Sequence, residues 1–323
     1  MDNVKENYNY ELEIRKHRVF LLKSIGFYNQ IEDFSELVQR ISQQNFASPK
    51  FLNYKNGILC LPLGMDASVY SLKGIVELCE IGDLVDAFIL VRKIRDNLYS
   101  DLFFLSEALN NRPNNYECDK SLLKMNQQEL EEEMLKYASA VLEAEDKNEN
   151  IQNINRWLNN EYSCNEKHNI RGSVFSFSNY KSCIENKNHE LKECHNKYLK
   201  PLFDDLGNNL NNYVHSNGPL FFSNSAINSN NDKYLNTVKH LLSLLHVVKK
   251  VFLIDLFFID STLFQTDDYI DAIELGLKPV EGSQYNVIYQ ILEEFQLIHK
   301  ENPDLYFYLK NNNRFSMKCF VDD

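Results

Sequence analysis

One predicted helix ends in a histidine that could act as an acid or a base. Residues 201–217 read PLFDDLGNNLNNYVHSN, and Asp204, Asn208, Asn211 and His215 recur in them every three or four positions. This spacing places the four side chains on one face of a helix. Histidine titrates near neutral pH, which suits proton transfer, and Asn211, one turn earlier, could orient its ring. The alternative is a structural role, in which the helix dipole stabilises a C-terminal histidine.

A second predicted helix, residues 83–109, carries two arginines at its apolar stripe. Arg95 falls inside the stripe, and Arg92 lies four residues before Asp96. A guanidinium at the edge of a core needs a partner. Asp96 can pair with Arg92 on the same helix, so we expect Arg95 to find its partner on another helix. Arg92 and Arg95 therefore have two candidate roles, an ion pair between helices or the binding of phosphate.

The charge of the chain is negative overall but uneven. There are 46 Asp and Glu against 34 Lys and Arg, a formal charge of −12, which disfavours nonspecific binding of nucleic acid over the whole surface. Residues 165–200, however, hold seven Lys or Arg and four Glu, a net charge of +3. In this stretch Lys192, Lys197 and Lys200 are the candidates for contacts with nucleic acid. A solvated helix face of mixed charge is the alternative.

Two of these segments resemble a known family. Residues Asn211–His215 are similar to the last helix of the HEPN superfamily, and Leu90–Leu105 (LVRKIRDNLYSDLFFL) resembles helices of bacterial abortive-infection proteins. The resemblance implies an all-α bundle. RNase members of the family carry Arg, a polar residue, three variable residues and His, cleave RNA without a metal, and usually pair two protomers at one site.

The resemblance assigns roles to residues of this chain. His215 matches the motif histidine and Asn211 the polar position, but Leu210 stands where the motif has arginine. In the family this arginine is thought to bind or polarise the scissile phosphate. The resemblance therefore implies one of two outcomes. Either Arg92 or Arg95 replaces the missing guanidinium, or the chain is an inactive relative that only binds.

Metal and cofactor chemistry have little support. Possible zinc ligands cluster in one stretch, but only Cys164 and His168 have the short spacing of a structural site; the others are Cys183, His189, Cys194 and His195. The patterns of a P-loop, a dinucleotide-binding turn, a zinc protease and a serine-hydrolase elbow are all absent from the sequence. We therefore expect no metal and no cofactor.

The cysteines and the apolar runs bear on location. The seven cysteines are odd in number and irregularly spaced, which predicts reduced thiols. Residues 1–17 lack the apolar segment of a signal peptide. The longest apolar run, Val251–Ile259, is interrupted by Asp255 and is far shorter than the roughly 20 residues of a membrane span. We expect a cytoplasmic protein without membrane contact.

Helices must position these candidate residues, because turn-forming residues are scarce. The 323 residues include only 10 Gly and 7 Pro, where roughly 22 and 16 would be average. Helical periodicity predicts an all-α bundle, with one possible β-hairpin over residues 51–61 around the turn Lys55-Asn56-Gly57. We divide the chain into an N-terminal appendage, residues 1–65, and a HEPN-like helical domain, residues 66–323.

Within that domain the strongest helical patterns are easily bounded. The predicted helices end or begin at caps, prolines and glycines. They cover residues 66–80, 83–109, 124–145, 154–161, 182–199, 201–217, 233–264, 267–274, 285–299 and 303–309.

These observations predict a HEPN-like protein of a bacterial antiviral or toxin system that acts on RNA. His215 would be the general acid or base, Asn211 would orient it, and Arg92 or Arg95 would hold phosphate. A homodimer or a complex with a partner protein is expected. The alternative is a non-catalytic helical subunit that binds a partner in a defence complex. The missing motif arginine and the acidic remainder of the chain favour this alternative, whereas the basic stretch favours RNA.

Overall fold

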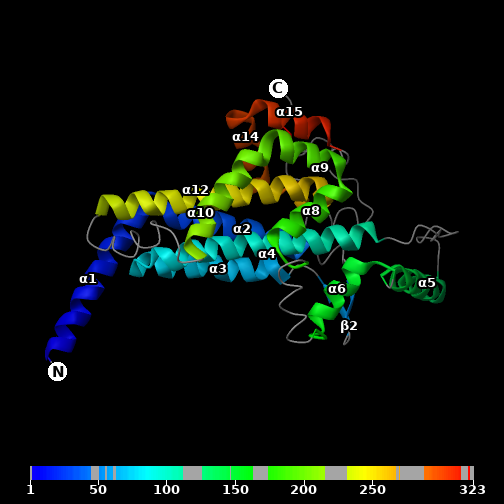
Figure 1. Ribbon diagram of the computed structural model, residues 1–323, viewed down its shortest axis with the longest axis horizontal. Coiled ribbons are helices and arrows are strands. Elements are labelled where there is room, and N and C mark those ends of the chain that lie inside the picture. Colours follow the sequence, from blue (N-terminus) through cyan, green and yellow to red (C-terminus); the bar gives the residue numbers. More distant parts are fainter. Residues whose placement is uncertain are drawn as a thin grey trace.

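The computed structural model is an all-α bundle with one short β-hairpin (Figure 1). It describes residues 2–44, 51–54, 57–60, 63–111, 126–145, 147–162, 174–214, 231–266, 269, 287–313 and 319–320. In chain order the elements are α1 (Asp2–Ser24), α2 (Phe27–Gln44), β1 (Phe51–Tyr54), β2 (Gly57–Cys60), α3 (Leu63–Ile81), α4 (Leu84–Asn110), α5 (Gln127–Glu145), α6 (Glu149–Leu158), α8 (Phe177–Lys187), α9 (His189–Cys194), η2 (His195–Leu199), α10 (Lys200–Val214), α12 (Asn231–Asp260), η4 (Ser261–Phe264), α14 (Tyr289–Glu301) and α15 (Pro303–Asn311).

Two long helices, α4 and α12, form the centre of the bundle. The α4 helix begins where the sequence predicts, because the side chain of Asp83 accepts a hydrogen bond from the Asp86 amide and caps the first turn. Gly82, at φ +87°, allows the sharp turn before this cap. The α12 helix ends at Asp260, and the last residues of the predicted helix form a 3₁₀ turn instead.

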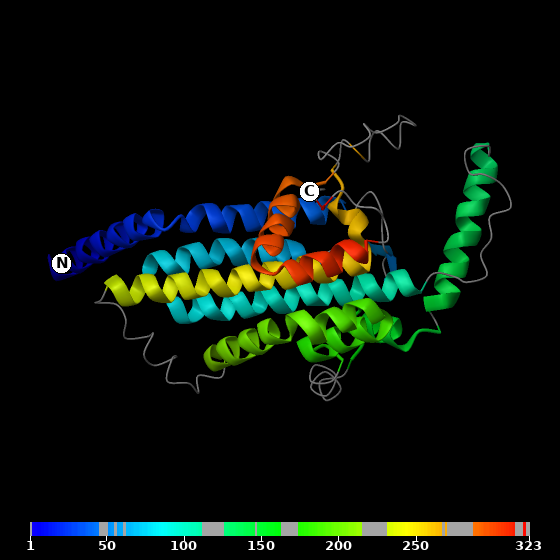
Figure 2. The ribbon, with the colours of Figure 1, turned by 90° about the horizontal axis from the view of Figure 1, so that it is seen from above.

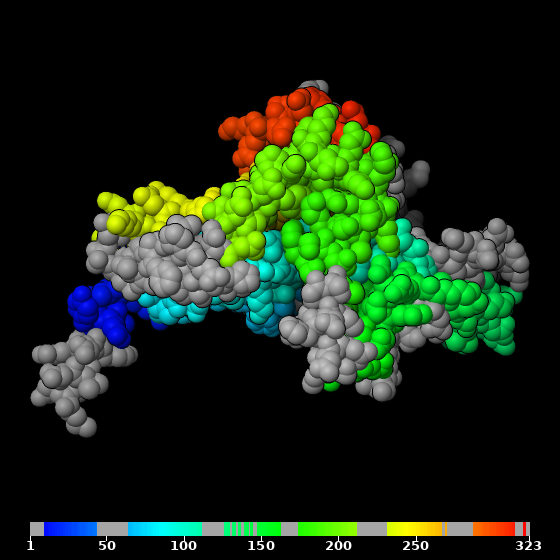
Figure 3. Space-filling view, in the orientation of Figure 1, coloured from blue at the N-terminus to red at the C-terminus, as the bar shows by residue number. Residues whose placement is uncertain are grey.

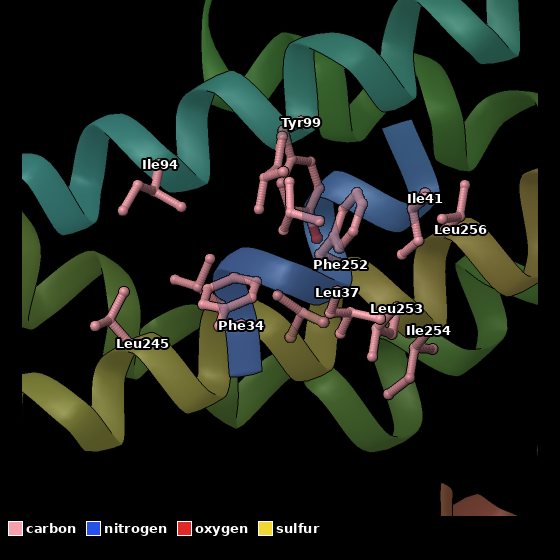
Figure 4. Packing of buried hydrophobic residues seen from close by; sticks show 14 of the residues in the cluster. Phe34, Leu37, Ile41, Ile94, Tyr99, Leu245, Phe252, Leu253, Ile254 and Leu256 are labelled. Atoms are coloured by element: carbon pink, nitrogen blue, oxygen red, sulfur yellow. The ribbon is translucent and has the colours of Figure 1, made fainter. Parts of the chain in front are cut away.

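The N-terminal helices belong to the same core. Figure 4 shows Phe34, Leu37 and Ile41 of α2 facing Phe252 and other apolar residues of α12. All of them lie in one cluster of buried residues that also contains the apolar side chains of α3 and α4. The boundary proposed at residue 65 therefore does not separate two cores, because α2 is part of the bundle that residues 66–323 were expected to form alone.

The predicted β-hairpin is present. Strands β1 and β2 pair antiparallel, with Phe51 opposite Cys60 and Tyr54 opposite Gly57. The second strand begins at Gly57, one residue earlier than expected. Within the described part of the chain this pair is the only sheet.

The helix predicted over residues 182–199 is divided. Asn188 has extended backbone angles, its side chain caps α9 by accepting from the Leu191 amide, and its Nδ2 donates to the Phe258 carbonyl. Asparagine favours such capping positions over helix interiors, so it ends α8 and begins α9. Asn148 likewise caps α6, which begins at Glu149, five residues before the expected start at residue 154, and ends at Leu158.

One helix stands apart from the others. In Figure 2, α5 projects away from the bundle, at the end opposite to the N-terminus. The helix expected over residues 267–274 lies outside the described residues. None of the helices described combines the length and apolar character needed to cross a bilayer.

Candidate functional site

A buried histidine lies where α4, α8, η2 and α12 meet. Only 1% of the His195 side chain is exposed. Its Nδ1 atom is 2.7 Å from Glu185 Oε1, and its Nε2 atom is 2.7 Å from Asp255 Oδ1. Tyr99 donates a hydrogen bond of 2.7 Å to the second oxygen of Asp255. Four elements that are distant in the sequence are therefore joined by one polar network.

A local irregularity of the helix accompanies this histidine. Residues His195–Leu199 form a π-helical turn, and both Cys194 before it and Lys200 after it have helical backbone angles. The α9, η2 and α10 segments are thus one continuous helix with an extra residue inserted. Such insertions are uncommon and are frequent at functional positions.

Charge stabilises the protonated histidine. Burial lowers the pKa of His195, but Asp255 and Glu185 outweigh burial and raise it to about 9. Burial raises the pKa of Glu185, whereas hydrogen bonds from His195 and Lys181 lower it to about 2. At neutral pH the imidazolium therefore donates to two acceptors, and Lys181 supplies a second cation beside Glu185.

Aromatic rings cover the network. The Phe203 and His195 rings pack edge to face, with their centres 4.8 Å apart. The Phe177 and Tyr99 rings pack in the same way, with their centres 4.7 Å apart. Lys181 Nζ lies 4.8 Å from the centre of the Phe203 ring. A protonated histidine closed in this way cannot take a proton from a substrate. We interpret the network as the scaffold that holds α4, α8, η2 and α12 together.

Arg95 is a part of this scaffold. Its side chain is 4% exposed, and its Nε and Nη2 atoms donate to Asp96 Oδ1 at 2.9 and 2.7 Å. Its guanidinium also lies 4.1 Å from the centre of the Phe177 ring. The expected ion pair to another helix is wrong, because the carboxylate comes from the next residue and α8 contributes an aromatic face instead.

Arg92 has unused hydrogen-bonding capacity. Its side chain is 24% exposed, and its Nε atom lies 3.7 Å from Asp96 Oδ2, beyond hydrogen-bond distance. The buried Nη1 atom of Arg92 has no hydrogen-bond partner among the described residues. Buried donors are rarely left in this state in folded proteins.

The α10 helix packs against α4, the helix that carries Arg92. Near the start of α10, the ring centre of Phe203 lies 6.2 Å from that of Tyr99 on α4. Farther along α10, Asn209 contacts His240 of α12. The ring centre of His240 lies 5.8 Å from that of Phe88 on α4. The α10 helix therefore runs antiparallel to α4, and its C-terminal half lies along the N-terminal half of α4. Asn211 is exposed in that half. His215 lies outside the described residues, so its distance from Arg92 stays a prediction.

Two of the candidate lysines share a surface hollow. Lys192 and Lys197 line it together with His189, Glu193 and Asn196, and its volume is about 440 Å³. Lys200 is exposed at the start of α10. In Figure 3, α8 to α10 form a large part of the face toward the viewer.

Two other lysines of the basic stretch form ion pairs with acidic side chains. Lys181 pairs with Glu185, and Lys187 pairs with the buried Glu107 of α4. Three further lysines of the described part of this stretch, Lys192, Lys197 and Lys200, are exposed on α9, η2 and the start of α10.

The described residues contain no group of three or more metal-binding side chains. Of the zinc candidates, Cys183 and Cys194 are free thiols, and His195 is committed to two carboxylates. Cys164 and His168 lie outside the part of the chain that is described.

No protein-family model, no curated protein and no solved structure matches this chain. The similarity to HEPN proteins therefore rests on the residues named above.

Proposed function

We propose that the protein is a HEPN-like protein of a bacterial antiviral or toxin system that binds RNA and cleaves it without a metal. The observation that carries this proposal is Arg92. Its Nη1 atom lacks a partner among the described residues, and it lies on α4, which packs against α10. Arg92 is therefore the candidate for the guanidinium that the motif lacks at Leu210. Guanidinium groups bind phosphate oxygens strongly and with directed hydrogen bonds.

The proposed division of roles is simple. Arg92 holds the scissile phosphate, His215 transfers the proton, and Asn211 orients the His215 ring. Without a metal, the ribose 2′-hydroxyl attacks the phosphorus and its proton passes to the neutral His215 ring. The bond from phosphorus to the 5′-oxygen breaks, and the 5′-oxygen takes up a proton from the protonated ring. The product pair is a 2′,3′-cyclic phosphate and a 5′-hydroxyl. Arg95 has no part in this scheme, because Asp96 and Phe177 already occupy it.

The exposed lysines fit a role in binding the strand. Lys192, Lys197 and Lys200 project from neighbouring turns, and phosphate contacts by exposed lysines supply affinity without sequence preference. Two protomers at one site, as in the family that the chain resembles, would double this surface.

The test is cleavage of a labelled single-stranded RNA in the presence of a metal chelator. We expect wild type to produce cyclic-phosphate ends and His215→Ala to lose cleavage with an unchanged melting temperature. His17→Ala, an exposed histidine on α1, is the matched control and should cleave like wild type. If His215→Ala folds and cleaves like wild type, the nuclease proposal is wrong.

A partner-binding subunit of a defence complex is the second candidate, and the α5 helix favours it. This helix stands away from the bundle in Figure 2. It exposes Glu131, Glu132 and Glu143, together with 69% of Leu135. An acidic helix with an exposed leucine suits a basic protein surface. This role predicts that His215→Ala leaves the activity of the complex intact, whereas Leu135→Asp disrupts its assembly.

A further inference from the structure

We propose that Arg92 forms a phosphodiester-binding site at which the chain's own Asp96, held by Arg95, is the competing anion in the absence of RNA. This inference rests on the proposed function, since it assigns a competitor to the phosphate of that site. Asp96 would then set the affinity for RNA, and neutralising it would strengthen binding.

The geometry resembles a bound anion. One oxygen of Asp96 accepts two hydrogen bonds from Arg95, and the other faces the Nε atom of Arg92 at 3.7 Å. A carboxylate and a phosphate present oxygens to guanidinium groups in a similar fork. Asp96 is 38% exposed, so the anion between the two arginines is accessible from solvent.

The charges at this position do not balance. Two guanidinium groups face one carboxylate, which leaves a net charge of 2 − 1 = +1. Arg95 is saturated by Asp96 and Phe177, whereas Arg92 is too far from Asp96 for a hydrogen bond and keeps a buried donor without a partner. The surplus charge and the unused donor belong to the same residue. A phosphodiester carries one negative charge, which would balance this surplus at the exposed part of the Arg92 side chain.

The position of the Asp96 carboxylate also stabilises the fold. Arg95 is almost completely buried, and a buried guanidinium without a counter-charge would be strongly destabilising. The carboxylate therefore cannot be lost from the fold at no cost, and RNA must compete with it for Arg92. The competition applies to any phosphodiester strand and does not depend on base sequence.

The experiment measures binding rather than cleavage. All proteins carry His215→Ala so that the RNA survives, and a fluorescent single-stranded RNA is titrated at one salt concentration. Asp96→Asn keeps an oxygen acceptor for Arg95 but removes the charge, and we expect it to bind RNA about tenfold more tightly. Glu36→Gln, which breaks a similar exposed pair with Arg40 on α2, is the matched control and should change binding less than twofold.

A second variant locates the effect. Arg92→Gln should weaken binding, and in the double variant Arg92→Gln/Asp96→Asn the gain should disappear. A parallel titration with inorganic phosphate shows whether the site recognises a free phosphate group or only the phosphodiester of an RNA strand. If inorganic phosphate competes with RNA in Asp96→Asn but not in Arg92→Gln, the phosphate group alone is recognised.

Unchanged or weaker RNA binding by a folded Asp96→Asn would overturn the inference, as would a gain that survives Arg92→Gln. If Asp96→Asn does not fold, Arg92→Gln decides, and unchanged RNA binding by that variant is then sufficient to reject the site. Loss of cleavage by His215→Ala in the separate assay is unaffected by either result, so the two proposals can fail independently.

Discussion

His195 links the stability of the fold to pH at the scale of a single residue. Its pKa is about 9 in the folded protein against 6.5 in a free chain, because Asp255 and Glu185 favour the imidazolium. A group whose pKa is raised on folding contributes stability below its unfolded pKa and loses that contribution as the pH rises through its folded pKa. Glu185, with a folded pKa of about 2, contributes above pH 4.5 and loses its contribution only in strong acid.

We therefore expect the free energy of unfolding to fall between pH 6.5 and pH 9, by on the order of 2–3 kcal/mol. Denaturant unfolding at several pH values measures this. His195→Gln should be less stable at pH 6.5, by about 3–5 kcal/mol, because it leaves the buried Asp255 without its cation. It should also lose most of the pH dependence. His17→Gln serves as control, and parallel pH profiles for wild type and His195→Gln would contradict the assignment.

At the scale of the elements, two helices approach closely through a glycine. Gly64, in the first turn of α3, faces the backbone of α4, and a Cβ atom there would overlap the carbonyl oxygen of Asn97. The same turn is capped from α4, since Asp101 accepts from the amides of Gly64 and Met65 at 2.9 and 2.6 Å. Anionic caps at helix N-termini stabilise the helix, so this carboxylate joins the two elements.

This contact predicts opposite effects for two helical glycines. Gly64→Ala should lower the free energy of unfolding by at least about 2 kcal/mol, because backbone atoms of α4 must move. Gly207 in α10 has no atom within 4 Å of its Cβ position, so Gly207→Ala should raise that free energy by about 0.5–1 kcal/mol through helix propensity alone. Thermal unfolding of the two variants compares them directly. Equal effects would show that the close approach of α3 and α4 does not determine the stability.

The bounds of α4 could be predicted from the sequence, whereas the π turn and the polar network around His195 could not. The α4 helix was predicted to within one residue at both ends because Asp83 is a local cap and the apolar spacing is regular. The π turn escaped prediction, since one inserted residue leaves no mark in composition. The polar network escaped because Tyr99 and Asp255 are 156 positions apart. Its only signal was a lone acid, Asp255, in the apolar run of α12.

At the scale of the whole molecule, the placement of charge matters more than its sum. The chain carries a formal charge of −12, yet three exposed lysines, Lys192, Lys197 and Lys200, follow one another along α9, η2 and the start of α10. Lys181 and Lys187 instead pair with Glu185 and with the buried Glu107. The sequence could identify the basic stretch but not this division, because the partner of Lys187 is Glu107 on a different helix.

If the lysine face binds RNA, its salt dependence should report the contacts. The triple variant Lys192→Gln/Lys197→Gln/Lys200→Gln should reduce the slope of log affinity against log salt by up to about 2, given about 0.7 per contact with a single strand. The control replaces three exposed lysines elsewhere, Lys16, Lys136 and Lys147, with the same loss of charge. An equal change of slope in the two triple variants would show that binding depends on net charge rather than on this face.

The π turn sets the rotational phase between two parts of one helix. A residue advances an α-helix by about 100°, so the inserted residue at 195–199 offsets α10 from α9 by that angle. Deleting one residue there would restore a regular helix but would rotate Leu206 and Leu210 out of the core and turn the Asn211 face by the same angle. The π turn therefore fixes the direction in which the polar stripe of α10 points relative to the surface hollow that Lys192 and Lys197 line.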